Sequence, residues 1–136
     1  MARRRRGGWR CPQRSEHGAA VVDVVLVLMV LTPLFLGILQ LGLVLFVRNT
    51  MGSAAAEGAR LAATSDRGPA EGEALTRRQI SQVVSGRFAR DVDARRVVID
   101  GAPTIEVVVR ATVPALGIGG PGVDLEVTGH AIEEPS

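Results

Sequence analysis

A long run without charge constrains this chain more than any other feature of its sequence. Residues 24–47 contain no charged side chain, although 22% of the whole chain is charged. As an α-helix this stretch would extend about 36 Å, enough to cross the hydrocarbon core of a bilayer. Pro33, Gly37 and Gly42 interrupt it, but membrane helices tolerate both residue types. We therefore expect one transmembrane helix, and the 136 residues leave room for only one further small domain.

A cleaved secretory signal is the main alternative interpretation of this run. The apolar region of such a signal has only about 7–15 residues, and the run here is much longer. Small residues at Ser53–Ala56 nevertheless resemble its cleavage site. A lasting membrane anchor fits the length better.

The charges around the run are distributed unevenly. Residues 1–18 hold six arginines against Glu16 alone, whereas residues 19–136 hold ten arginines against 13 acidic residues. Because positive charge favours the cytoplasmic side, we expect residues 1–18 to be a basic cytoplasmic leader. The protein would then lie in the cytoplasmic membrane as a single-pass protein, with its C-terminal domain extracytoplasmic. The arginines could bind phosphates, but Trp9 is the only aromatic residue among them, so we expect no nucleic-acid partner.

The sequence lacks the residues that several types of catalysis and metal binding require. All 16 basic side chains are arginines, which excludes lysine bases and Schiff bases. Cys11 is the only cysteine, and His17 and His130 are far apart in sequence, so we expect no metal site.

Two short patterns imitate binding motifs. Residues 117–122 satisfy G-x-G-x-x-G, but no helix is expected after them to receive a pyrophosphate, so we expect no cofactor. Asp91, Asp93 and Asp100 lack the spacing of a calcium loop and are interpreted as surface charges. A membrane-tethered hydrolase remains an alternative, yet no nucleophile, base and orienting group can be assembled. We expect a protein that is not an enzyme.

Asp23 is an anomaly at the start of the apolar helix, because a lone carboxylate in a membrane segment is costly. It could simply lie at the level of the lipid headgroups. Alternatively, cleavage after Gly18 would give Ala19 a new ammonium group and make Asp23 the fifth residue of the product. The ammonium and the carboxylate could then pair.

A basic leader that ends in Gly18, an acidic residue five positions later and an apolar helix together resemble the signal sequences of type IV pilins and pseudopilins. More narrowly, Gly18–Val27, the early Pro33, Gly37–Gly42, Arg48-Asn49 and the block Ala54–Ala63 are similar to the TadE-like family. Asp23 replaces the Glu that is usual there, and Val24 replaces an aromatic residue.

This resemblance implies a minor pseudopilin-like protein that acts in assembly of a Tad/Flp-type pilus or related secretion machine, in adhesion and surface attachment. It implies processing between Gly18 and Ala19 by a prepilin peptidase, and a role for Asp23 in assembly. The implied partners are the lipid bilayer, that peptidase and other pilin-like or Tad-system membrane subunits. An uncleaved single-pass scaffold or anchor protein of the same family remains the alternative.

The helical pattern continues beyond the membrane. We expect a transmembrane helix over 19–47 and an amphipathic helical extension over 48–65, in which small residues gather on one face and Ser53, Glu57, Arg60 and Thr64 on the other. The small face could dock on the helix of a neighbouring subunit or pack on its own domain. Its candidate helix-packing residues are Gly52, Ala55, Ala56, Ala59 and Ala63, and Ala62 lies on the same face.

Residues 66–136 are expected to form a small extracytoplasmic α+β domain. Turn-forming residues over 65–73 precede a helix predicted over 75–90, with Thr76 and Gln79 as its capping box. Alternating apolar residues then predict strands over 97–99, 104–113 and 123–131, with a turn at Asp100–Pro103. The predicted fold class is thus α+β, with an N-terminal transmembrane α-helix that continues outside the membrane, a second helix and a small antiparallel β-sheet.

Overall fold

The computed structural model describes residues 16–64, 66–115 and 121–133, with side chains from residue 18 onward. Most of the basic leader, including Trp9 and Cys11, and most of the glycine-rich loop at 117–122 lie outside the described residues. The chain divides into two compact units, residues 1–36 and 37–136.

The described part of the first unit is the beginning of helix α1, which runs Glu16–Ala62 and contains Pro33. Alanine, leucine and methionine favour this helix, while the many valines are less favourable. Every side chain from Gly18 to Phe35 is exposed. This segment therefore has no core of its own and presents apolar side chains all round.

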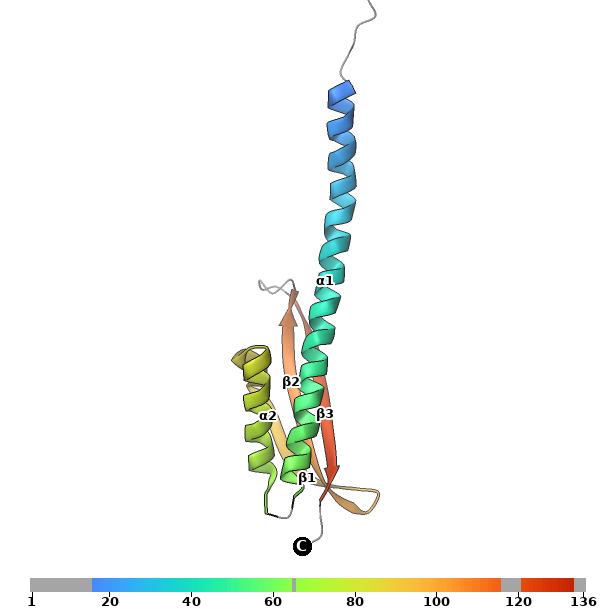
Figure 1. Ribbon diagram of the computed structural model, residues 1–136. Coiled ribbons are helices and arrows are strands. Elements are labelled where there is room, and N and C mark those ends of the chain that lie inside the picture. Colours follow the sequence, from blue (N-terminus) through green and yellow to red (C-terminus); the bar gives the residue numbers. More distant parts are fainter. Residues whose placement is uncertain (1–15, 65, 116–120, 134–136) are drawn as a thin grey trace, which may run out of the picture. The chain divides into compact units, whose positions relative to one another are not determined.

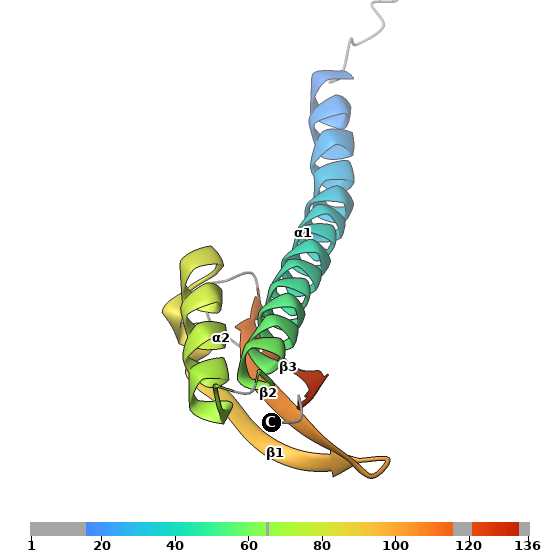
Figure 2. The ribbon, with the colours of Figure 1, turned by 60° about the horizontal axis from the view of Figure 1, so that its bottom comes forward.

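The second unit has two layers. The part of α1 from Gly37 onward and helix α2 (Pro69–Val83) lie side by side on one face of a three-stranded sheet (Figures 1 and 2). The strands are β1 (Asp91–Ile99), β2 (Ala102–Pro114) and β3 (Gly122–Ile132), and a short 3-10 helix, η1 (Gly86–Ala89), precedes β1. The order is β1-β2-β3 and both pairs are antiparallel. The predicted α+β fold class is confirmed.

The core lies between the sheet and the helices. Strand β2 contributes the alternating inward residues that its pattern predicts, and α1 contributes a matching stripe of small and apolar side chains. The fully buried residues include Val47, Met51, Ala55, Ala59, Ile80, Ile105, Val107, Val109 and Val113. Val47, the last residue of the charge-free run, is thus part of this core.

A two-residue turn joins β1 and β2. Ile99 pairs with Ala102, and the intervening Asp100 and Gly101 have φ angles of 51° and 81°. Two consecutive positive φ angles define the type I′ turn that matches the twist of a hairpin, and Asp-Gly is a favoured sequence for it. The turn predicted at Asp100–Pro103 is therefore shorter than expected, because Ala102 and Pro103 already belong to β2.

The predicted start of the second helix is wrong. Helix α2 begins at Pro69, where the fixed φ of proline suits a first helical position, and the Gly68 amide donates to the Glu71 carboxylate at 3.0 Å. Thr76 is not a cap: it is buried in the helix and donates to the carbonyls of Ala54 and Gly72. The helix also ends at Val83, before the predicted end at 90, and β1 begins six residues earlier than the strand predicted at 97–99.

Candidate membrane-anchoring and assembly site

The apolar surface of α1 is the most prominent candidate site. Among the helices that the structure describes, α1 is the one that is long and apolar enough, over Gly18–Ala62, to cross a membrane. Most of its large apolar side chains from Val21 to Phe46 are exposed, with Phe35 61% and Ile38 62% exposed, whereas Leu36 and Val44 are half-buried. A surface of this size is not stable in water, so it requires either lipid or a protein partner.

Gly18 and Ala19, the predicted processing residues, lie two and three residues after the first described residue of α1 and are exposed. Their peptide bond is therefore in the first turns of the helix.

Asp23, the predicted assembly residue, lies on α1 and is exposed. It makes no hydrogen bond or ion pair with any other residue that the structure describes. Ala19 precedes it by four residues, and residues at this spacing lie on the same face of a helix. The structure thus places the two predicted partners one helical turn apart.

The small-residue face of α1 packs inside its own domain, which is one of the two alternatives that the sequence leaves open. Ala55, Ala59, Ala62 and Ala63 are buried, while Gly52 and Ala56 are half-buried. Ser53, Glu57, Arg60 and Thr64 are exposed, as the amphipathic pattern predicts.

Two glycine contacts explain why these residues are small. A Cβ atom on Gly72 of α2 would lie 2.5 Å from the carbonyl oxygen of Gly58 and 2.7 Å from the Cβ of Ala62. A Cβ atom on Gly129 of β3 would meet the backbone of Ala55. The backbones of α1, α2 and β3 therefore approach more closely than any larger side chain would permit.

No contact or role was predicted for Gln40 from the sequence, although it is a polar residue in the second half of the charge-free run. Its amide nitrogen donates to the carbonyl of Pro114 at the end of β2, at 3.3 Å. This bond fixes the end of β2 beside α1 within the apolar run. A single side-chain amide among apolar residues is the sequence signal from which this hydrogen bond could have been predicted.

Arg77 is a second position whose structural contacts were not predicted from the sequence. It pairs with Glu73 one turn earlier at 2.7 Å and donates to the carbonyls of Ala89 and Val92. Arg77 therefore joins the end of η1 and the start of β1 to α2. No local pattern predicts this role, because the acceptors are backbone atoms.

The outer face of the sheet carries paired charges across its strands. Glu106 on β2 accepts from Arg95 on β1 at 2.6 Å and lies 3.2 Å from His130 on β3, and Arg110 donates to Glu126 at 2.7 Å. The hydrogen bond from Arg95 is the main cause that lowers the pKa of Glu106 below its ordinary 4.5. Asp91, Asp93 and Asp100 are exposed surface residues.

Residues 18–60 match the family model described as TadE-like protein. This match confirms the resemblance inferred from the sequence, and it covers the apolar helix, Gly18, Ala19, Asp23 and most of the small-residue face. It supports a protein related to the Tad pilus. Comparisons with curated proteins and with solved structures found no match.

Proposed function

We propose that this chain, which is TadE-like over residues 18–60, is a membrane-anchored minor pseudopilin-like protein that acts in assembly of a Tad/Flp-type pilus or related secretion machine. One observation carries the proposal. Within the segment that matches the family, the exposed apolar part of α1, residues 18–47, bears one carboxylate, Asp23, about one turn beyond the Gly18-Ala19 bond. Its role is structural, not enzymatic.

The proposed topology places the leader in the cytoplasm and the α+β domain outside the cytoplasmic membrane. Six arginines before the apolar run support this orientation, since positively charged segments stay on the cytoplasmic side. A prepilin peptidase would then cut between Gly18 and Ala19.

Cleavage creates the charge that Asp23 requires. The new Ala19 ammonium group and the Asp23 carboxylate, four residues apart, form an ion pair within one helix or between neighbouring helices. In a medium of low dielectric constant an unpaired charge is strongly disfavoured, whereas a matched pair is tolerated. Pairing between neighbours would set the axial position of one helix against the next.

Replacement of the carboxylate tests this mechanism. Asp23→Asn should still insert in the membrane, but should reduce co-isolation with sister pilin-like subunits at least tenfold, because the ammonium loses its partner. Asp23→Glu, which restores the residue usual in the family, should recover assembly. The measurement is cross-linking and co-purification from membranes, normalised to the amount of inserted protein.

Glu57→Gln is the matched control, because Glu57 is an exposed acidic residue farther along the same helix. It should leave co-isolation unchanged. Full assembly of the Asp23→Asn variant would reject the pairing role of Asp23.

A further inference from the structure

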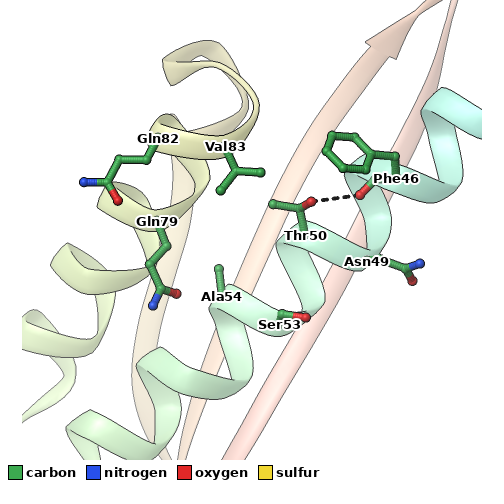
Figure 3. Close-up of a pocket in the computed structure, with 8 residues that line it drawn as sticks. All are labelled: Phe46, Asn49, Thr50, Ser53, Ala54, Gln79, Gln82 and Val83. Carbon is green, nitrogen blue, oxygen red and sulfur yellow. Dashed lines mark hydrogen bonds between the residues drawn. The ribbon is translucent and has the colours of Figure 1, made fainter.

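A groove runs between α1 and α2 in the second unit. Phe46 of α1 and Val83 of α2 point toward each other across it, and the strands of the sheet lie behind the two helices in this view (Figure 3). Their side chains are 52% and 57% exposed, whereas Ala54, which also lines the groove, is buried. The domain therefore leaves this apolar surface open.

Uncharged polar side chains border the groove on both sides. Asn49 and Ser53 come from α1, and Gln79 and Gln82 come from α2. None of these four side chains makes a hydrogen bond or an ion pair with another residue in the part of the chain that the structure describes. No described residue that lines the groove carries a charge, so the groove does not suit an ionic ligand.

The polar border is complementary to a copy of itself. A side-chain amide has both donors and an acceptor, so amides from two identical surfaces can bond to each other. Asn49 and Gln82 point to opposite sides of the groove (Figure 3). When a second copy is turned by half a rotation about an axis parallel to the helices, its α2 lies over α1 of the first copy. Asn49 then faces Gln82 of the second copy, and Phe46 faces Val83 of the second copy.

The heights of these residues along the helices agree with this arrangement. The Thr76 hydroxyl of α2 donates to the Ala54 carbonyl of α1 at 3.2 Å, and the two helices run antiparallel. Counted from this contact, Asn49 lies five residues toward the start of α1, and Gln82 lies six residues toward the end of α2, which is the same direction in space. Each residue adds about 1.5 Å, so Asn49 and Gln82 have nearly the same height, and the half rotation leaves heights unchanged.

Opposite charges continue the same two faces beyond the groove. Arg60 lies seven residues after Ser53 on α1, and Glu71 lies eight residues before Gln79 on α2, so each is about two turns away on the same face of its helix. Both are exposed, and neither forms an ion pair with a residue that the structure describes. Counted from the contact between the helices, Arg60 and Glu71 are six and five residues away, at nearly the same height. Arg60 therefore faces Glu71 of the second copy.

We propose that these faces of α1 and α2 form an interface between two copies of the chain, and we name it the helix-pair interface. Its residues are Phe46, Asn49, Arg60, Glu71, Gln82 and Val83. Each contact occurs twice, because a two-fold axis brings the same patch of both chains together.

A second copy fits this surface better than an unrelated partner. The apolar, the amide and the charged side chains each meet their complement on the same surface of another copy, which requires no further protein. The axis also keeps the α1 helices of the two copies parallel, as two chains anchored in one membrane in one orientation require. For this choice of axis the proposal rests on the anchoring proposed above.

Thiol cross-linking of the full chain tests the helix-pair interface. One chain carries Asn49→Cys and a differently tagged chain carries Gln82→Cys, both in a Cys11→Ser background, and the two are expressed together without a prepilin peptidase. Because the leader is then retained, the result does not depend on the ion pair of Asp23. We expect a short bismaleimide to join the two chains in membranes. Thr128→Cys, at an exposed position of β3, replaces Gln82→Cys as the control and should give no product.

Val83→Arg should weaken the dimer. Val83 is 57% exposed in the single chain, so the domain tolerates the change, but in the dimer the guanidinium would lie against Phe46 without a partner. A buried charge without a partner is strongly disfavoured, so the association constant should fall about 100-fold or more. Ile132→Arg is the matched control, because Ile132 is a 69% exposed apolar residue at the end of β3, and it should leave the constant unchanged. Sedimentation equilibrium in density-matched detergent micelles measures both.

Three results would overturn the proposal. A chain that is monomeric in micelles and gives no cross-linked product in membranes has no such interface, as when the groove holds a different subunit or lipid. A dimer that Val83→Arg leaves intact would assign the contact to another surface. Loss of the dimer in Asp23→Asn would assign it to the apolar helix, since the helix-pair interface predicts no effect there. Release of the chain by alkaline extraction of the membranes would report a failure of anchoring separately.

Discussion

At the scale of single residues, glycine sets how closely the two helices of the domain approach. Gly58 of α1 and Gly72 of α2 are both buried and face each other through their backbones. Thr76 then reaches across to the carbonyl of Ala54 with its hydroxyl group, at 3.2 Å. The small-residue pattern therefore serves a contact inside the domain, and the assembly role proposed here depends on Asp23 instead.

Gly72→Ala should destabilise the domain. The added methyl group would lie 2.5 Å from the Gly58 carbonyl oxygen, and the backbone atom cannot move aside without separating the helices. Overpacking of this kind costs about 1–3 kcal/mol in the free energy of unfolding. Chemical denaturation of the full chain in detergent micelles, followed by circular dichroism, measures the change.

Gly52→Ala is the control for this substitution, because its added Cβ atom meets nothing within 4 Å. Alanine is the better helix former, so this variant should gain about 0.5–1 kcal/mol. Equal stability of the Gly72→Ala variant and the unaltered protein would contradict the close approach of the helices.

At the scale of elements, the outer face of the sheet is held by cross-strand pairs. Arg95 on β1 and His130 on β3 both contact Glu106 on the central strand, which links all three strands in one row. Such pairs at a surface contribute little individually, but they fix the register of the strands.

The lowered pKa of Glu106 predicts a dependence of stability on pH. Because the folded state holds this carboxylate ionised more firmly than the unfolded state, the contact stabilises the fold above pH 4.5, and the contribution is lost as the pH falls through the lowered pKa. Glu106→Gln should lose less than about 1 kcal/mol at neutral pH and nothing well below pH 4.5. Urea denaturation at both pH values measures this difference.

Glu57→Gln provides the comparison, because Glu57 is exposed and makes no ion pair with the described residues. It should show no such pH-dependent loss. A Glu106→Gln variant that is destabilised equally at both pH values would show that the carboxylate charge is not the cause.

The sequence predicted which helices and strands exist more accurately than the residues at which they begin and end. Alternation of apolar residues over 105–113, interrupted by Val108, identified β2 and its inward face, since this strand is central and one of its faces is core. The start of α2 was missed because Pro69 lies among turn-forming residues, where composition suggested a linker. The contacts of Gln40 and Arg77 were also missed, because they join positions far apart in the sequence and their acceptors are backbone carbonyls.

At the scale of the whole molecule, the chain consists of two units with different requirements. Among the described side chains of the first unit, those other than Asp23 and Thr32 are apolar, and the second unit has a core and ion pairs across the outer face of its sheet. The family match spans the end of one unit and the start of the other. In the proposed function, anchoring and assembly belong to the TadE-like segment, and α2 and the three strands lie beyond the residues that this match covers.

The central claim is that the leader is removed to create a charge partner for Asp23. The most direct test is the N-terminal residue of the membrane-extracted protein, determined by intact mass and peptide sequencing with and without a co-expressed prepilin peptidase. The proposed function predicts a product that begins at Ala19 and appears only with the peptidase. A leader that is retained in both cases would contradict processing and identify the chain as an uncleaved membrane anchor.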